Sequence, residues 1–278
     1  MGTSTLKYKY AAYYVAIKDD FCLEESIVEL RKQGVDKVLI VSPTAYWSTG
    51  EKQSSDDFYS ILKIASKTAS GVDSVLLRAD RKDNCAIYTE ALYRNHAIEL
   101  LLREYAPEAD FILTVDADEL WTPGTLEHVD SLAEEGSVKI DLPGIPVAGA
   151  PGLPVEGATD VILTATSRDL RFAWGRSIGE SPAKVKKGTQ PILHFSATRR
   201  TREEVAAKMR QSAHYIDPTY DFEGWIKNTL PHTHVGMQNV HMYKTPVNIW
   251  PALRAWTAEE LTAMPSSLKP YLDLSQNT

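Results

Sequence analysis

A buried-strand pattern that ends in two aspartates constrains the fold of this chain more than any other feature. Residues Phe111 to Val115 form an apolar run with β-branched members, which is typical of a central strand covered on both faces. The run stops at Asp116-Ala117-Asp118. Two carboxylates this close at the end of a buried strand disfavour each other's charge unless a cation neutralises them, and a hard divalent ion is the simplest such cation. The turn therefore predicts a ligand-binding edge of a sheet.

Strand and helix patterns alternate along the chain before this run. Strand patterns cover residues 10–17, 35–41 and 72–77, and helical patterns cover residues 23–33, 56–69 and 86–105. Short helical crossovers of this kind join parallel strands. We therefore expect an α/β fold with a mostly parallel, doubly wound central sheet flanked by helices, in which ligands bind outside the carboxyl ends of the strands.

The chain after the acidic turn has a less regular pattern. Strand patterns follow at residues 137–142, 161–166 and 190–196. Residues 143–160 are rich in Pro, Gly and Ala, and we expect either a flexible flap over the site or a plain surface loop there. Thr201 is the predicted N-cap of the next helix.

Length and composition set the expected organisation. With 278 residues, of which 43% are hydrophobic, the chain has enough apolar material for a sizeable core. We expect one main unit over residues 1–216 and a helical C-terminal extension over residues 217–278 that packs on the same domain. No apolar run reaches the ~20 residues of a membrane span. The start of the chain lacks a signal-peptide pattern and the two cysteines fit a reducing compartment, so we expect a cytoplasmic protein.

Charge is unevenly distributed along the sequence. The net charge of −7 argues against wholesale nucleic-acid binding. Residues 165–210, however, carry eleven Lys or Arg against four acidic residues. A solvated basic face is the plain interpretation of such a tract, and an anion-binding surface is the alternative.

Three features together resemble the GT-A glycosyltransferases of the family 2-like kind. They are the strand and helix order that leads to the Asp-x-Asp turn, the Arg94-Asn95 pair on the preceding helix, and the late His194-Phe195-Ser196. The resemblance covers about residues 10–214. It implies a GT-A (Rossmann-like) fold and the metal-dependent transfer of a sugar from a UDP- or GDP-sugar to a hydroxyl acceptor.

The resemblance also implies a metal site. Asp118 would be a direct ligand of Mn²⁺ or Mg²⁺, Asp116 would contact the donor ribose or the ion through water, and His194 would be the third ligand. Such an ion stabilises the charge that develops on a diphosphate leaving group. An imidazole beside carboxylates favours Mn²⁺, because Mg²⁺ prefers oxygen ligands alone.

Further residues are expected around the donor. Asp19 or Asp20 would approach the nucleotide base or ribose, and Arg94 would lie near the phosphates or the sugar. Lys184 and Arg199 flank His194, and we expect them to bind the diphosphate or an anionic acceptor, such as a glycan or a hydroxymethylated base in DNA.

The catalytic base is not evident from the sequence. Many members of the family carry an acidic pair on the helix after the acceptor loop, and this chain has no Glu-Asp or Asp-Asp pair after residue 120. Asp169, Glu180 and Asp141 are single candidates for the base. A surface or strand-end position is the plain interpretation of each of them.

Other interpretations of the same residues stay open. The acidic turn could cap the helix that follows it, and His232, His234 and His241 could bind zinc. A non-catalytic nucleotide- or sugar-binding module and a metal-dependent phosphoryl or nucleotidyl transferase are the rival functions. The glycine-rich loop that would hold a triphosphate is missing after the first strand pattern.

Overall fold

The structure is a computed structural model, and the part of the chain that it describes is continuous apart from short gaps. The described residues are 6–17, 21–46, 50, 52–68, 72–77, 86–136, 138–157, 160–179, 183–212, 214–215, 217–244 and 250–275.

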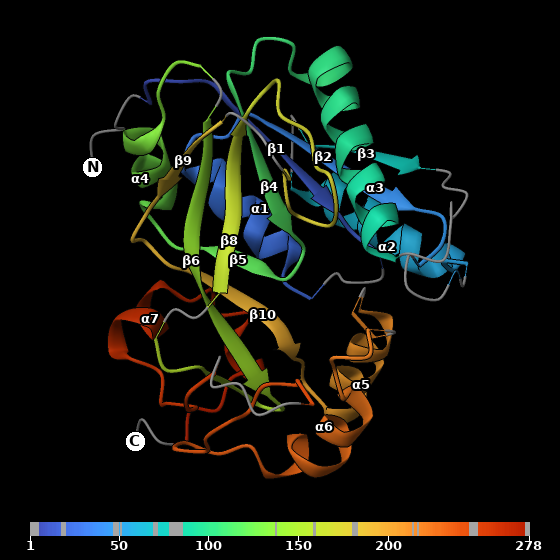
Figure 1. The fold of residues 1–278 in the computed structure, drawn as a ribbon, viewed down its shortest axis with the longest axis vertical. Coiled ribbons are helices and arrows are strands. Elements are labelled where there is room, and N and C mark those ends of the chain that lie inside the picture. The colour runs from blue at the N-terminus through green and yellow to red at the C-terminus, as the bar shows by residue number, and fades with distance from the viewer. Residues whose placement is uncertain are drawn as a thin grey trace.

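A single mixed sheet forms the centre of the described fold (Figure 1). Its strands follow the order β3-β2-β1-β4-β8-β6-β10-β5, and β7 and β9 both pair with β6 outside this path. The strands are β1 (Tyr10–Val15), β2 (Lys37–Pro43), β3 (Val72–Leu77), β4 (Phe111–Asp116), β5 (Glu119–Trp121), β6 (Val138–Gly149), β7 (Gly152–Pro154), β8 (Asp160–Ser167), β9 (Lys184–Lys187) and β10 (Ile192–Thr198).

The first four strands of this order are parallel, as their short helical crossovers require. Helix α1 (Leu23–Lys32) and helix α2 (Ser55–Lys67) cover one face of the sheet, where Ile27 and Ile61 pack in one buried cluster with Tyr14 of β1. Helix α3 (Ala86–Leu100) covers the other face, where Ile98 packs with Tyr13. Neighbouring residues of β1 therefore face opposite layers of helix, which confirms the predicted α/β sheet flanked by helices.

The second half of the sheet is mixed. Strand β8 lies antiparallel between β4 and β6, and β10 runs parallel to β6. The predicted flap over residues 143–160 is wrong, because β6 continues as a strand to Gly149 and β7 turns back onto it. Val147 and Ala148 are fully buried there. Burial between two neighbouring strands therefore outweighs the local tendency of this Pro- and Gly-rich segment to form a loop.

The remaining helices are short. They are the π-helical turn η1 (Leu101–Tyr105) that continues α3, the α-helices α4 (Thr125–Leu132), α5 (Arg202–Gln211), α6 (Phe222–Asn228) and α7 (Ala258–Ala263), and the 3-10 turns η2 (Leu230–His232) and η3 (Lys269–Tyr271). Thr201 caps α5 as predicted, since its side chain accepts the N–H of Glu204 while the Glu204 carboxylate accepts the Thr201 N–H. No helix in the described ranges combines the length and the apolar character needed to cross a bilayer.

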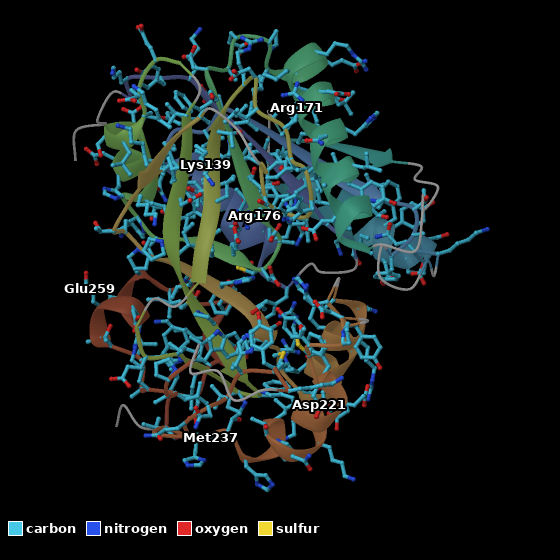
Figure 2. All side chains as sticks on the ribbon, in the orientation of Figure 1. Lys139, Arg171, Arg176, Asp221, Met237 and Glu259 are labelled. Carbon is cyan, nitrogen blue, oxygen red and sulfur yellow. The ribbon has the colours of Figure 1, made fainter. Side chains whose placement is uncertain are left out.

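The C-terminal segment packs on the late strands. Ala148 of β6 and Ala197 of β10 share a buried cluster with Trp225 and Trp250, and Phe195 shares another with Trp256. The segment forms the lower part of the molecule, where Asp221 and Met237 lie in Figure 2. Its residues Tyr220 and Trp250 line a pocket together with Val15 and Asp116, at the carboxyl ends of β1 and β4.

Candidate functional site

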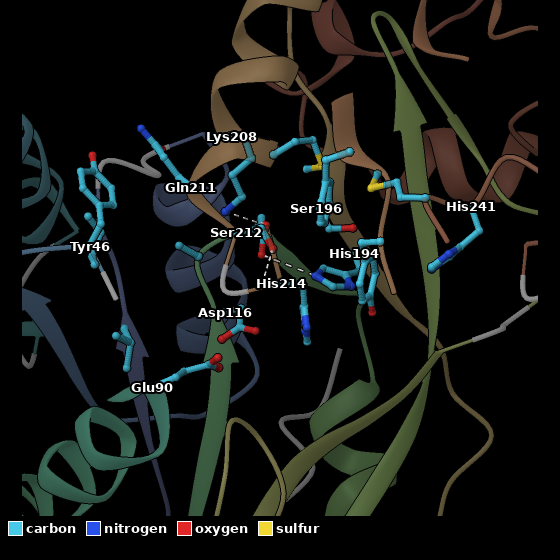
Figure 3. A pocket seen from close by; sticks show the side chains of 18 of the residues that line it. Tyr46, Glu90, Asp116, His194, Ser196, Lys208, Gln211, Ser212, His214 and His241 are labelled. Carbon is cyan, nitrogen blue, oxygen red and sulfur yellow. Dashed lines mark hydrogen bonds and ion pairs between the residues drawn. The ribbon is translucent and has the colours of Figure 1, made fainter. Parts of the chain in front are cut away.

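A pocket of about 380 Å³ lies where the carboxyl ends of β1 and β4 meet α5 and the C-terminal segment (Figure 3). The sheet supplies its acidic floor and the C-terminal segment supplies an aromatic wall. Its lining residues include Glu90, Arg94, Asp116, Asp118, His194, Ser196, Lys208, Met209, His214, Tyr220, His241, Tyr243 and Trp250. This is the edge of the sheet at which the sequence predicts a ligand site.

Strand pairing brings the acidic turn and the late histidine together. Strand β10 pairs antiparallel with β5, so His194 lies opposite Glu119, and the Phe195 N–H donates to the carbonyl oxygen of Asp118 at 2.8 Å. The His194 Nε2 consequently lies 3.7 Å from the Asp118 Oδ1. Two groups from distant parts of the sequence therefore face the same cavity.

Asp116 is held by two guanidinium groups. Arg94 Nη2 donates to one of its carboxylate oxygens at 2.8 Å, and Arg176 Nη1 donates to the other at 3.1 Å. Burial by itself would raise the pKa of Asp116, but the positive charges of Arg94 and Arg176 outweigh it and hold this pKa well below its ordinary value. Asp116 is therefore a permanent carboxylate at the edge of the pocket.

Arg176 also neutralises an acid beneath the turn. It forms an ion pair with the fully buried Glu119, whose Oε2 lies 3.1 Å from the Arg176 Nη2, and its Nε donates to the Leu163 carbonyl at 2.8 Å. Burial raises the pKa of Glu119, and the Arg176 charge opposes this. No role was assigned to Arg176 from the sequence. Three acidic residues within four positions at a buried turn require nearby cations, and this requirement was the sequence feature that pointed to a residue such as Arg176.

Two more cations approach Asp118 from the side opposite His194. The Lys208 Nζ lies 3.2 Å from the Asp118 Oδ2, and the Arg199 Nη2 lies 4.0 Å from the same oxygen. Arg199 is buried behind the turn, and its guanidinium lies over the ring of Phe21 at 4.7 Å from the ring centre. Arg199 thus lies close to the acidic turn but is not among the residues that line the pocket, whereas Lys208 of α5, which was not singled out from the sequence, does line it.

The donor set suits a divalent ion that shares its coordination with a ligand. In the described part of the chain, no group of three or more His, Cys, Asp or Glu side chains is arranged to hold a metal. The 3.7 Å between the Asp118 Oδ1 and the His194 Nε2 is compatible with two ligands that each lie about 2.1 Å from one ion. Mg²⁺ commonly takes one or two carboxylates plus substrate phosphates and water, and an imidazole beside a carboxylate favours Mn²⁺ over Mg²⁺. Asp118 and His194 are the two residues that could hold such an ion.

Lys184 lies elsewhere, which corrects its expected place beside the donor. Strand β9 pairs with the start of β6, where Lys184 is opposite Val138, whereas His194 is opposite Pro146. Eight residue steps along a strand correspond to roughly 26 Å. The Lys184 side chain is 71% exposed and its Nζ lies 2.9 Å from the Glu134 carboxylate.

Asp169 is also remote from the pocket. It follows β8, which runs antiparallel to β4, so that Ser167 lies opposite Phe111 at the start of β4. The length of β4, about 17 Å, separates that end of the sheet from Asp116. Asp169 therefore does not lie where a catalytic base would act. Asp141 does not line the pocket either.

The remaining predicted residues are Arg94, three acidic residues and the possible zinc ligands. Arg94 lines the pocket, with its guanidinium on Asp116 and on Glu90 at 2.6 Å. Glu180, Asp19 and Asp20 lie outside the described residues. Of the possible zinc ligands, His241 faces the pocket, while His234 Nδ1 contacts the His232 carbonyl at 2.6 Å.

Known proteins provide only distant likenesses. No protein-family model and no curated protein match the chain. Glucosyl-3-phosphoglycerate synthase from M. tuberculosis is a similar solved structure, with 14% identity, a TM-score of 0.41 and coverage of 93% of each chain. The 4-diphosphocytidyl-2C-methyl-D-erythritol synthase from Anaerococcus prevotii has 12% identity and a TM-score of 0.41, covering 72% of this chain and 94% of that one.

A third solved structure, inositol-1-phosphate CTP transferase from T. maritima, has 13% identity and a TM-score of 0.39, covering 74% of this chain and 97% of that one. By name, these neighbours are two synthases and one CTP transferase. At these identities and scores they assign neither a family nor an activity to the chain.

Proposed function

We propose that the chain is a metal-dependent glycosyltransferase that moves a sugar from a UDP- or GDP-sugar to a hydroxyl acceptor. One observation carries the proposal: Asp118 and His194, far apart in the sequence, lie 3.7 Å apart in a pocket at the carboxyl ends of parallel strands. Parallel α/β sheets bind their ligands at this edge.

Sugar transfer needs stabilisation of a leaving diphosphate. The bond between the anomeric carbon and the phosphate oxygen breaks, its electron pair stays on the nucleoside diphosphate, the acceptor oxygen bonds to the carbon, and the proton of the acceptor hydroxyl passes to a base or to the departing diphosphate. A divalent ion supplies Lewis-acid stabilisation to such a leaving group. In this chain Asp118 and His194 would hold the ion. Asp116, kept ionised by Arg94 and Arg176, would accept hydrogen bonds from a ribose or from water on the ion.

The acceptor side of the proposal rests on charge and shape. The pocket wall from the C-terminal segment contains Tyr220, His241, Tyr243 and Trp250, and aromatic faces suit the apolar face of a sugar or a base. Of the Lys and Arg residues in the basic tract of residues 165–210, Lys208 lines the pocket, while Lys184 is remote from it. The tract permits an anionic acceptor, such as a glycan or a hydroxymethylated base in DNA, as a secondary form of the proposal.

Nucleotide release tests the proposal directly. The protein is incubated with UDP- and GDP-sugars in EDTA or with Mn²⁺, and free UDP or GDP is measured for the wild type, for Asp118→Asn and for the exposed control Asp36→Asn. We expect release that requires Mn²⁺ in the wild type and the control, and none in Asp118→Asn.

The rival functions give different products. A nucleotidyl transferase would release pyrophosphate from a nucleoside triphosphate in the presence of a sugar phosphate. A binding module would bind the nucleotide sugar without turnover, and a phosphoryl transferase would release phosphate from simple esters. Any of these results without nucleoside diphosphate release would contradict the glycosyltransferase proposal.

A further inference from the structure

Helix α5 fixes the backbone of Lys208 beside the pocket. The Thr201–Glu204 capping box sets the start of the helix, and Val205 and Met209 bury its inner side against the C-terminal cluster. Lys208 lies on the turn between these two residues, and its side chain is 27% exposed and lines the cavity. The helix thus presents an ammonium group to the pocket on a flexible four-carbon stem.

The two oxygens of Asp118 have different neighbours. Oδ1 faces the His194 imidazole at 3.7 Å, and Oδ2 faces the Lys208 ammonium at 3.2 Å. Dashed lines in Figure 3 mark these contacts of Lys208 and His194. An ion bound between Asp118 and His194 would therefore come close to the Lys208 ammonium.

Arg199 contacts the same oxygen but is held differently. Its Nη1 donates to the carbonyl oxygens of Phe195, at 2.8 Å, and of Thr198, and its plane lies over Phe21. These contacts hold the guanidinium behind the turn. Of the two cations on Asp118 Oδ2, Lys208 is the one that faces the cavity.

The charges around the turn are already balanced by side chains. Four carboxylates, namely Glu90, Asp116, Asp118 and Glu119, contact four cations, namely Arg94, Arg176, Arg199 and Lys208. A divalent ion added on Asp118 would leave an excess of positive charge and would repel the Lys208 ammonium at close range. An anion in the same cavity would relieve both effects.

We propose that Lys208 is a diphosphate-binding residue that exchanges Asp118 for the donor's diphosphate when the ion binds. This inference rests on the proposed function and adds a residue to it. The ammonium makes charge-assisted hydrogen bonds to phosphate oxygens, while Asp118 is released to the ion. Binding of the metal to Asp118 breaks the Lys208–Asp118 ion pair and frees Lys208 for the diphosphate. Binding of the diphosphate to Lys208 likewise frees Asp118 for the metal, so the two ligands bind cooperatively.

Opposite effects on two ligands test the inference. The affinities for Mn²⁺ alone, and for UDP and GDP in the presence of Mn²⁺, are measured by calorimetry for the wild type, Lys208→Met, Lys208→Arg and the exposed control Lys227→Met. In Lys208→Met we expect Mn²⁺ to bind more tightly, because its competitor for Asp118 is gone. We expect the diphosphates to bind roughly 10- to 100-fold more weakly, as for the loss of a hydrogen bond to a charged group.

The controls separate this role from a structural one. Lys208→Arg should keep most of the diphosphate affinity, and Lys227→Met should match the wild type for both ligands. Unchanged diphosphate affinity in Lys208→Met, or a parallel loss of Mn²⁺ and diphosphate, would overturn the inference and leave the proposed function standing. If the wild type binds neither UDP nor GDP with Mn²⁺, the proposed function itself fails.

Discussion

The backbone N–H of Phe195 donates a hydrogen bond to the carbonyl oxygen of Asp118 at 2.8 Å. This bond continues the pairing of β10 with β5, and it fixes the residue before Phe195, the candidate ligand His194, against the acidic turn. Because backbone pairing sets the distance, the Asp118–His194 geometry exists before any ligand binds. Such preorganisation reduces the cost of ordering the site on binding.

Removal of His194 should weaken metal binding more than folding. In His194→Ala, one of two side-chain ligands is lost, and we expect the Mn²⁺ affinity in the presence of UDP to fall about 10-fold or more. His96→Ala, at an exposed position on α3, is the matched control. Calorimetric titration measures both variants, and equal Mn²⁺ affinities in the wild type and His194→Ala would exclude His194 as a ligand.

Removal of Arg176 should destabilise the fold. Arg176→Met leaves Glu119 buried without its ion-pair partner, and breaking a buried pair in this way costs about 3 to 5 kcal/mol. The free energy of unfolding in urea measures the loss. Arg103→Met removes an exposed pair with Glu104 and should change stability by less than about 1 kcal/mol. A loss in Arg176→Met no larger than in this control would show that Glu119 is neutralised in another way.

The contribution of Asp116 to stability should depend on pH. Its pKa in the folded protein lies below the ordinary value of 3.8, so the folded state holds the proton less tightly than the unfolded state does. The stabilisation is therefore complete above the ordinary value and declines as the pH falls below it toward the folded-state pKa. We expect the difference in unfolding free energy between the wild type and Asp116→Asn to be constant from pH 7 to about pH 5 and to shrink below 3.8.

Chemical denaturation at several pH values measures this difference. If the difference in unfolding free energy between the wild type and Asp116→Asn grew as the pH fell, the lowered pKa assigned to Asp116 would be contradicted.

An anionic acceptor should bind in a salt-dependent manner. If a DNA acceptor is bound through several phosphates, the logarithm of its affinity should fall with the logarithm of salt concentration by about 0.9 per phosphate contact. Fluorescence anisotropy with an oligonucleotide that contains hydroxymethylated bases measures this slope. Salt-independent binding would exclude a polyanion as the acceptor and would favour a neutral glycan.

Local patterns predicted the first half of the fold well. The strand at Phe111 and the alternation of strands and helices before it follow from side-chain periodicity, which is a property of neighbouring residues. The capping box at Thr201 and Glu204 is equally local. The apolar run of a buried strand stops where charged residues begin, and this local change of polarity predicted that Asp116 and Asp118 lie at the edge of the sheet.

The errors concern residues whose position depends on partners remote in sequence. Lys184 and His194 are close in the chain, but β9 and β10 pair with different ends of β6. Asp169 follows a strand whose antiparallel direction carries it away from the site. The segment that ends at Gly149 forms a strand because β7 and β10 pair with it, and no pattern within residues 143–149 indicates those partners.

The sequence by itself determined the α/β character of this chain and the acidic end of its central strand, since both arise from the polarity and order of adjacent residues. Only the tertiary structure decided which cations neutralise the acids. Arg176 comes from a loop beyond β8 and Lys208 from α5, and strand order and direction bring them to the turn. Those features are set by burial and backbone hydrogen bonding across the whole sheet, which are not properties of any short stretch of sequence.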